Sequence, residues 1–375
     1  MKPLKNLIRI VLAALCVVSC DKGDGGGLSM SLSSRTGYSV TKLESGSGEF
    51  SYVTPAIKLE YAGATQEEVP HFKVTFPSDH SKYRAACLTY TMCSWNEGPS
   101  AWDMTTIISI KNKKDGKWYE FTRAFTPYGG SFDKNWSKSY YMDITDFLPM
   151  MEGETEFSVY YCGWDATETR AHAVKLGFDF YEGQAEKNVV FTSKIYDSCE
   201  NSTPGYRRCW PYGFDVYEGV SYNIEDAGRC GPRTIRIPAG VKSAVVRVDI
   251  TGHGMDYDGK FTDRAGYQVN GAAEFDYQDY TVVFNGTALD KKGHVFEANG
   301  TNYPQAGTYY YDRAGWGPGK PANVHYWEIR NIPDEGTTIN LDIDFERFTA
   351  GSTMTPNSDS NAYYIVEADI FGYDR

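Results

Sequence analysis

Alternation of apolar and polar residues at every second position is the feature that most constrains the fold of this chain. In the segment TINLDIDF, Ile339, Leu341 and Ile343 alternate with polar residues, and the segments AVVRVDI and TEFSVYYC behave similarly. A period of two is that of a β-strand, because successive side chains point to opposite faces. No segment carries a sustained helical stripe, and turn signals such as KKDGK, PAG and DEGT recur between the strands. The pattern predicts an all-β chain of antiparallel sandwiches, with functional residues on the loops.

The first part of the chain, residues 1–20, predicts an export signal that precedes the fold. Basic residues stand before an apolar run that is too short to span a bilayer, and this run ends in VVSC. We expect Cys20 to be the acylated first residue of an exported lipoprotein, which its lipid holds in the cell envelope, at the outer membrane or cell surface. An ordinary secretory signal with a chance cysteine is the alternative. The polar stretch DKGDGGG then predicts a flexible tether over residues 21–30.

The charge of the mature chain argues against nucleic acid as a partner. Loss of Lys2, Lys5 and Arg9 with the signal reduces the 37 basic residues to 34, against 49 acidic residues, so the net charge is −15. Aromatic residues make up 15% of the chain, and 29 residues are tyrosine. This composition suits a sheet protein whose surface binds sugars or other flat ligands, although most of the tyrosines are expected simply to fill strands.

The cysteines that follow Cys20 favour disulfide bonds. They are Cys87, Cys93, Cys162, Cys199, Cys209 and Cys230. An even number in an exported chain is typical of disulfide pairing, but the sequence leaves the pairing open. One bridge among the last three is the simplest expectation, and Cys162 should be oxidised if it lies beside Cys87 or Cys93. The spacing does not match a zinc site, so we expect neither a metal nor another cofactor.

A polar segment at 181–188 divides the mature chain into two halves of similar length. It follows the strand-like LGFDFYEG and precedes VVFTSKIY. Each half has a suitable length for one eight-stranded jelly roll. We therefore predict an N-terminal jelly-roll domain over 31–186 and a C-terminal jelly-roll domain over 187–375.

Several segments, in order along the chain, carry a family resemblance. IKNKKDGKWYEFTRAFTPY, MDITDF and TEFSVYYCGW in the first half, and RVDITGHG and YDRAGWGPG in the second, resemble the peptide:N-glycosidase F family. Members of that family are amidases that remove N-linked glycans from asparagine. The resemblance implies two eight-stranded jelly rolls packed side by side, with the site in the cleft between them.

The resemblance also implies site residues. The family's principal acid lies in a Trp-Asp pair, which matches SAWDMTT here and makes Asp103 the catalytic candidate that activates water. Trp164, in YYCGW, matches a tryptophan of the sugar site. Arg313 and Trp316, in YDRAGWGPG, match the arginine and tryptophan of the second domain. We therefore expect Asp103, Trp164, Arg313 and Trp316 to line one cleft, with structural packing as the alternative role for the tryptophans.

Several positions depart from the family pattern. Cys162 stands where the family has a glutamate, and a thiol with an ordinary pKa of roughly 8.5 is mostly neutral. Asp258 or Gly259 lies nearest to the position of a second family glutamate. His253, which we keep as a substrate-binding candidate, replaces a tryptophan, and Met104 stands where the family usually has an arginine. A single family acid is therefore kept.

These departures leave more than one function open. Glu97, Asp165, Asp256 or Asp258 could act as substitute acids in a glycoamidase that hydrolyses N-glycoproteins or glycopeptides with an altered site. The alternative is a non-catalytic lipoprotein that binds glycans or glycoproteins on the same scaffold. A copper monooxygenase needs clustered histidines, whereas no His-His or His-x-His pair occurs here, and no Gly-x-Ser-x-Gly supports a serine hydrolase.

Overall fold

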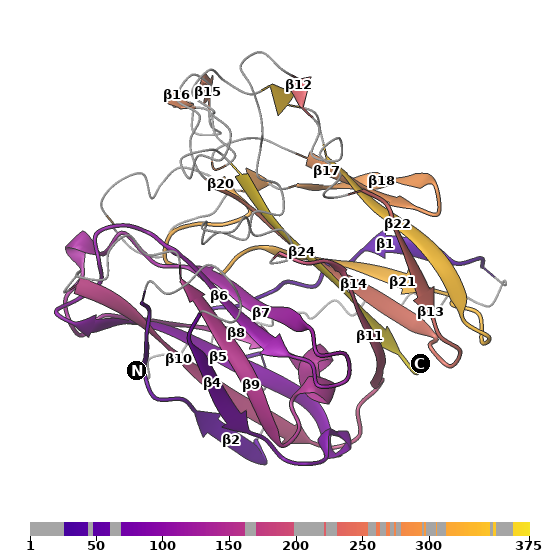
Figure 1. Cartoon of the computed structure of the whole chain (residues 1–375), viewed down its shortest axis with the longest axis horizontal. Helices are drawn as coiled ribbons and strands as arrows, with labels where there is room; N and C mark the ends of the chain where they lie inside the picture. Colours follow the sequence, from indigo (N-terminus) through magenta and orange to yellow (C-terminus); the bar gives the residue numbers. More distant parts are fainter. Residues whose placement is uncertain are drawn as a thin grey trace, which may run out of the picture.

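The chain is nearly all β and forms two jelly-roll sandwiches, as the alternation predicted (Figure 1). The computed structural model describes residues 26–43, 48–60, 69–161, 170–198, 221–222, 231–253, 260–262, 268–270, 274, 279–294, 296–297, 305, 313–345, 348–349 and 363–375. Within these ranges no helix is both long enough and apolar enough to cross a membrane.

The first sandwich consists of two antiparallel sheets from the N-terminal half. One sheet has the order β2 (Phe50–Val53), β10 (Arg170–Glu182), β5 (Tyr83–Asn96), β8 (Ser137–Asp143), with β3 (Ile57–Lys58) also paired to β10. The other has the order β4 (His71–Thr75), β9 (Glu154–Tyr161), β6 (Thr105–Lys111), β7 (Trp118–Phe125). Short 3-10 helices connect some strands: η1 (His80–Lys82), η2 (Gly129–Ser131) and η3 (Thr145–Met150).

The second sandwich also consists of two antiparallel sheets, and these include a strand from the N-terminal region. Its larger sheet has the order β1 (Ser29–Leu32), β21 (Val324–Arg330), β14 (Ser243–His253), β24 (Tyr363–Tyr373), β11 (Val189–Tyr196). Its smaller sheet has the order β13 (Arg233–Ile237), β22 (Thr337–Phe345), β17 (Asp279–Phe284), β18 (Thr287–His294). Three two-stranded antiparallel sheets pair β12 (Ser221–Tyr222) with β23 (Phe348–Thr349), β15 (Lys260–Thr262) with β16 (Gln268–Asn270), and β19 (Phe296–Glu297) with β20 (Arg313–Ala314).

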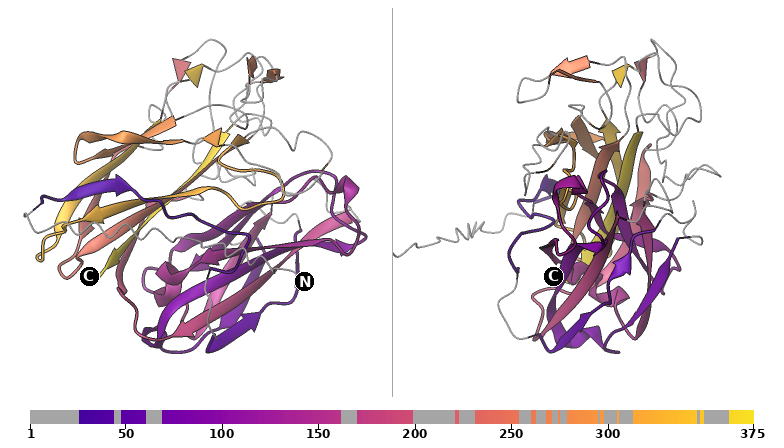
Figure 2. Two further views of the ribbon diagram at one scale, coloured as in Figure 1. Left: turned by 180° about the vertical axis from the view of Figure 1, so that it is seen from behind. Right: turned by 90° about the vertical axis from the view of Figure 1, so that its left-hand side faces the viewer.

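The position of β1 corrects the predicted tether over 21–30. Met30 of β1 pairs with Ile329 of β21, and its side chain is buried in the core of the second sandwich. In the left view of Figure 2 the indigo strand β1 lies beside the orange and yellow strands of the second half. Backbone pairing at the edge of β21 and burial of Met30 make Ser29 and Met30 part of the second sandwich rather than of the predicted tether.

Each sandwich has its own apolar core, which follows the alternation in the sequence. On β22, Ile339, Leu341 and Ile343 are buried, whereas Asn340 between them is exposed. The first sandwich is filled largely by aromatic rings, with Phe76 and Phe180 stacked at 5.4 Å between ring centroids. The period of two in the sequence therefore identifies the inward-facing residues of β22.

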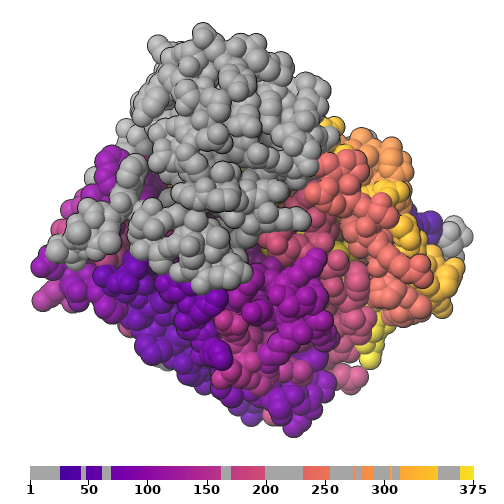
Figure 3. All heavy atoms as spheres, in the orientation of Figure 1, coloured from indigo at the N-terminus to yellow at the C-terminus, as the bar shows by residue number. Residues whose placement is uncertain are grey.

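The outward faces of several strands are buried as well, because the two sandwiches pack against each other. Figure 3 shows atoms of the purple and magenta first half of the chain directly beside orange and yellow atoms of the second half. On β14, Ala244 and Val246 belong to the core of the second sandwich, whereas Val245 packs with the core of the first. The charged residues Arg247 and Asp249 share the outward face with Val245 and are also buried. The contact between the sandwiches is therefore both apolar and ionic.

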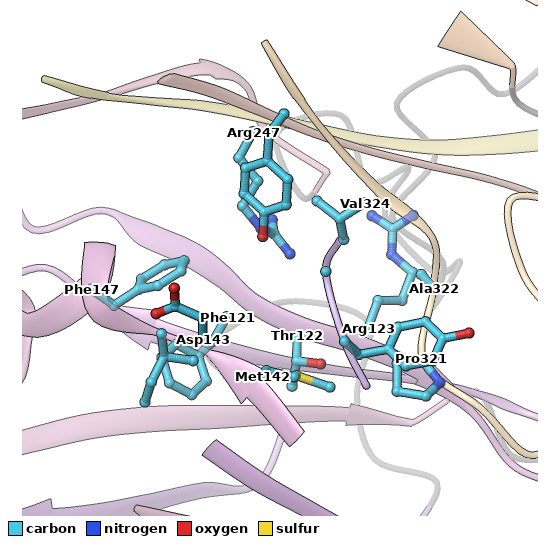
Figure 4. Close-up of a pocket in the computed structure, with 14 residues that line it drawn as sticks. Phe121, Thr122, Arg123, Met142, Asp143, Phe147, Arg247, Pro321, Ala322 and Val324 are labelled. Atoms are coloured by element: carbon cyan, nitrogen blue, oxygen red, sulfur yellow. The ribbon is translucent and has the colours of Figure 1, made fainter. Parts of the chain in front are cut away.

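A small pocket lies within this contact (Figure 4). Phe121, Thr122 and Met142 line it from the first sandwich, and Arg247 and Val324 line it from the second. The residues that line it do not belong to the candidate site described below, which lies at a different place along the contact.

The described cysteines are not in disulfide bonds. Cys87 and Cys93 lie on β5 and are free, buried thiols. Burial raises the pKa of each thiol above its ordinary value. Cys162, Cys199, Cys209 and Cys230 lie outside the described residues, so a bridge among them stays a prediction.

Candidate functional site

Asp103 lies in the loop that joins β5 to β6, two residues before β6 begins. The next residue, Met104, fixes the loop against the end of β7: its N–H donates to Thr126 Oγ1 at 2.8 Å, and its carbonyl accepts from Thr126 N–H at 3.0 Å. The side chain of Asp103 is partly exposed. Asp103 is therefore held at the rim of the first sandwich by a strand end rather than by a flexible loop alone.

Two aromatic residues stand beside Asp103. The ring of Trp102 is 63% exposed and meets the ring of Tyr128 edge to face, with 6.5 Å between centroids. Tyr128 is buried and hydrogen-bonds the carboxylate of Asp103. The first sandwich thus presents an acid, a phenol and an exposed indole face together.

Arg313, on β20, is the cation of this site and comes from the second half of the chain. Its side chain is fully buried. Its Nη2 donates to the Tyr128 hydroxyl at 2.9 Å, and its Nε donates to Glu274 Oε1 at 2.8 Å. Although burial disfavours the charged form, the charges of Glu274, Tyr128 and Asp103 raise the pKa of Arg313, which stays protonated. The guanidinium joins residues of both sandwiches.

Glu274 completes a compact group of two carboxyls around one guanidinium. Its side chain is 17% exposed, and its backbone carbonyl accepts from Ala314 N–H at 2.8 Å. Burial raises the pKa of Glu274 to about 7; Arg313 opposes this rise and the negative charge of Asp103 adds to it. Burial also raises the pKa of Asp103, while Arg313 and the Tyr128 hydrogen bond offset part of that rise. The two acids therefore share one cation and influence each other's protonation.

Behind Arg313 three aromatic rings form a stack. Trp316 is 4% exposed and lies 4.3 Å from Phe125 and 5.3 Å from His253, measured between centroids. The indole N–H of Trp316 donates to the Gly252 carbonyl at 2.7 Å, and its ring centroid lies 5.0 Å from the Arg313 guanidinium carbon. The stack supports Arg313 from the side of the core.

Gly315 allows the loop to turn tightly between Arg313 and Trp316. Its φ of +76° is disfavoured for residues with a side chain, and a Cβ would lie 2.0 Å from the Ile250 carbonyl oxygen. The glycine is required both for its backbone conformation and for the close approach of this loop to β14.

The substitution Gly315→Ala is expected to lower the free energy of unfolding by about 3 kcal/mol, because it adds a backbone clash to the strain of a positive φ. Gly116→Ala is the matched control, since Gly116 has a φ of +73° but no atom within 4 Å of its Cβ position. The control should lose only about 1 kcal/mol. Urea unfolding measures both losses, and equal losses would show that the contact with Ile250 is unimportant.

The structure brings together some of the residues predicted from the sequence and leaves others outside it. Asp103 and Arg313 are joined through Tyr128, which hydrogen-bonds both, whereas Trp316 and His253 lie behind Arg313 in the ring stack. Glu97 is exposed in the turn after β5. The remaining candidates lie outside the described residues, namely Cys20, Cys162, Trp164, Asp165, Asp256, Asp258 and Gly259.

Sequence reasoning missed two members of the site, Glu274 and Tyr128. Glu274 meets Arg313 across 39 positions of the chain, and Tyr128 meets it across 185. Neither pair has a local spacing signal. Tyr128 is the last residue of IKNKKDGKWYEFTRAFTPY, a segment that carries the family resemblance, but the resemblance assigned this tyrosine no role.

The chain is similar to known amidases in both sequence and fold. No family model matches it. The chain is 26% identical over 305 residues to the peptide-N(4)-(N-acetyl-β-D-glucosaminyl)asparagine amidase F of Elizabethkingia miricola, covering 79% of this chain and 76% of that protein. Its fold is similar to that of recombinant peptide:N-glycanase F, with a TM-score of 0.63, 21% identity and coverage of 86% of this chain and 95% of the other.

A second solved structure has a fold similar to that of this chain. The glycosylasparaginase PNGase F from Flavobacterium meningosepticum matches with a TM-score of 0.61 and 20% identity, covering 86% of this chain and 96% of that one. The sequence similarity extends over most of the chain, and the two jelly rolls occur in the same arrangement. Together these findings show that the chain resembles peptide:N-glycosidase F in sequence over most of its length and shares the fold of that enzyme.

Proposed function

We propose that the protein is a glycoamidase, which hydrolyses the amide between asparagine and N-acetylglucosamine in N-glycoproteins or glycopeptides. The observation that carries this proposal is the group formed by Asp103, Tyr128, Glu274 and Arg313, in which two acids of raised pKa share one buried cation. Perturbed acids beside a fixed cation are typical of sites that move protons. The similar proteins named above are amidases of this kind by name.

In this proposal Asp103 is the general base. Its carboxylate accepts a proton from water while the water oxygen attacks the amide carbon. The carbon–nitrogen bond then breaks, the proton passes to the leaving nitrogen, and the products are an aspartate side chain and a glycosylamine. Asp103 is suited to this step because it is partly exposed, whereas Arg313 behind it is fully buried.

The other residues orient the reacting groups. Arg313 and Tyr128 hold the carboxylate of Asp103: Arg313 Nη2 donates to the Tyr128 hydroxyl at 2.9 Å, and this hydroxyl hydrogen-bonds the carboxylate. Glu274 orients Arg313 through their ion pair, in which Arg313 Nε donates to Glu274 Oε1 at 2.8 Å. The exposed ring of Trp102 offers a face for a sugar or peptide group, whereas Trp316 and His253 support Arg313 rather than contact the glycan.

Hydrolysis in heavy-oxygen water tests the proposed function. A denatured N-glycoprotein and a free glycopeptide are incubated with the protein, and the peptides are analysed by mass spectrometry. A glycoamidase converts asparagine to aspartate with one heavy oxygen in the new carboxyl group. No conversion of either substrate, together with measurable glycan binding, would support the non-catalytic lipoprotein, which the departure at Cys162 keeps as the second candidate.

The kcat/KM of the protein is expected to rise with pH through about 7, because ionised Glu274 completes the ion pair that orients Arg313. Below that pH Glu274 is protonated and the pair is lost. Glu274→Gln should remove this limb and lower kcat/KM by about 10- to 100-fold at high pH. A pH profile of both proteins provides the measurement, and an unchanged limb in the variant would assign the ionisation to another group.

We also propose that the protein is exported and anchored by a lipid on Cys20. This proposal rests on the leader and the VVSC segment of the sequence. Replacement of Cys20 by serine should move the protein from the membrane fraction to the soluble fraction. Retention in the membrane fraction would argue against a lipid on this residue.

A further inference from the structure

Two loops that carry site residues touch each other backbone to backbone. One is the segment 97–104, which contains Asp103, and the other is the segment 126–132, which contains Tyr128. Gly129 N–H donates to the Ser100 carbonyl at 3.0 Å, and a Cβ on Gly129 would lie 2.2 Å from that oxygen. A glycine at this position lets the two loops approach so closely.

Arg170, the first residue of β10, ties these two loops together. Its Nε donates to the Pro99 carbonyl at 2.9 Å, and its Nη2 donates to the carbonyls of Gly129 at 3.2 Å and Phe132 at 3.1 Å. A planar guanidinium can satisfy several acceptors in a fixed geometry, which a lysine ammonium does not reproduce. Gly98 has a φ of +119°, and its Cβ position lies 3.0 Å from Arg170 Nη2, so the first loop runs directly along the guanidinium.

His172 adds a second contact from the same strand face, two residues further along β10. It is fully buried, and its Nδ1 lies 3.1 Å from Ser100 Oγ. Burial, with a smaller contribution from the charge of Arg170, lowers the pKa of His172 to about 3. The histidine is therefore neutral at every pH at which the site would work, and this contact does not change with pH.

We infer that Arg170 is a positioning residue, which holds Asp103 and Tyr128 in register with Arg313 by fixing the carbonyls of Pro99, Gly129 and Phe132. This inference rests on the proposed function, because the register matters only if Asp103 acts on a substrate. Arg170 lies at the end of a strand and is partly exposed, and it is not a member of either apolar core. Its contacts serve the two loops rather than the packing of the sandwich.

Arg170→Met is expected to lower kcat by about 10- to 100-fold with little change in KM, because small displacements of a catalytic group cost this much while the substrate contacts remain. The kcat of Arg170→Lys should lie between those of Arg170→Met and the wild type, since an ammonium can reach one or two of the carbonyls. Lys175→Met, an exposed position on the same strand, is the control and should keep the wild-type kcat. Among these variants, Arg170→Met alone should also shift the acid limb of the pH profile of kcat/KM.

A second readout does not depend on activity. In protein labelled with 5-fluorotryptophan, the fluorine resonance of Trp102 is identified by its absence in Trp102→Phe. Arg170→Met should shift or broaden this resonance and leave that of the buried Trp327 unchanged. Arg170→Lys should give a smaller change in the Trp102 resonance, and it replaces Arg170→Met in this test if the methionine variant does not fold.

The two readouts separate the inference from the proposed function. If the wild type has no amidase activity, the proposed function fails, yet the Trp102 resonance still tests whether Arg170 holds the loops. A Trp102 resonance in the Arg170 variants identical to that in Lys175→Met would overturn the inference. The inference would also be overturned if the wild type is active and Arg170→Met leaves its kcat unchanged.

Discussion

Replacement of Asp103 by asparagine is expected to lower kcat by about 10²- to 10⁴-fold, the usual loss when a general base is removed. Asparagine has nearly the same shape but cannot accept a proton from water, so the cleft and its affinity for glycans should hardly change. Turnover of a glycopeptide gives kcat, and calorimetry with the same glycopeptide gives the affinity. The expected outcome is a protein that binds its substrate normally and turns it over slowly.

Asp133→Asn is the matched control for this change. Asp133 is exposed in the loop after η2, and its carboxylate accepts from Asn135 N–H at 2.8 Å, a contact that asparagine can keep. Its activity should equal that of the wild type. A second comparison distinguishes catalysis from binding: Trp102→Ala should weaken glycan binding more than Asp103→Asn does. Full activity of Asp103→Asn would remove Asp103 from the mechanism.

Lys194→Met is expected to lower the free energy of unfolding by about 3 to 5 kcal/mol, because it breaks a buried ion pair and leaves the acids uncompensated. Lys194 contacts Glu367 directly and lies 3.6 Å from Asp369, and all three side chains are buried at the contact between the sandwiches. The backbone N–H of Glu120 in the first sandwich also donates to Glu367, at 3.2 Å. Urea unfolding measures the loss.

The pH dependence of this loss has a definite sign. Burial raises the pKa of Asp369 well above its ordinary value, and Lys194 opposes that rise. Without the lysine the pKa of Asp369 in the folded protein rises further, so the additional cost in the variant appears as the pH exceeds the pKa that Asp369 has in the folded wild type. Lys194→Met should therefore lose more stability at about pH 8 than at about pH 4.

Lys242→Met is the control for the buried pair. Lys242 contacts Asp334 on the surface, where the two side chains are 41% and 85% exposed. Exposed pairs contribute about 0 to 1 kcal/mol, so this variant should be nearly as stable as the wild type. Equal losses in Lys194→Met and Lys242→Met would mean that the interface acids are solvated or protonated in the native state.

The sequence by itself predicted an all-β chain of antiparallel sandwiches, and its resemblance to the peptide:N-glycosidase F family implied two jelly rolls. Alternation is a local property, and on β22 it identified the buried residues Ile339, Leu341 and Ile343 correctly. The Trp-Asp pair and the loop YDRAGWGPG also led to Asp103 and Arg313, which the structure brings together. These inferences needed only neighbouring residues or the order of short motifs along the chain.

The tertiary structure alone decided what the outward faces meet and which residues complete the site. On β14, alternation places Arg247 and Asp249 on the face away from the strand's own core, but it cannot show that a second sandwich covers this face instead of water. Likewise, Glu274 and Tyr128 reach Arg313 only when distant loops are brought together by the packing of the two sandwiches. The physical reason is that period and propensity act over a few residues, whereas burial of charge depends on contacts between segments far apart in the chain.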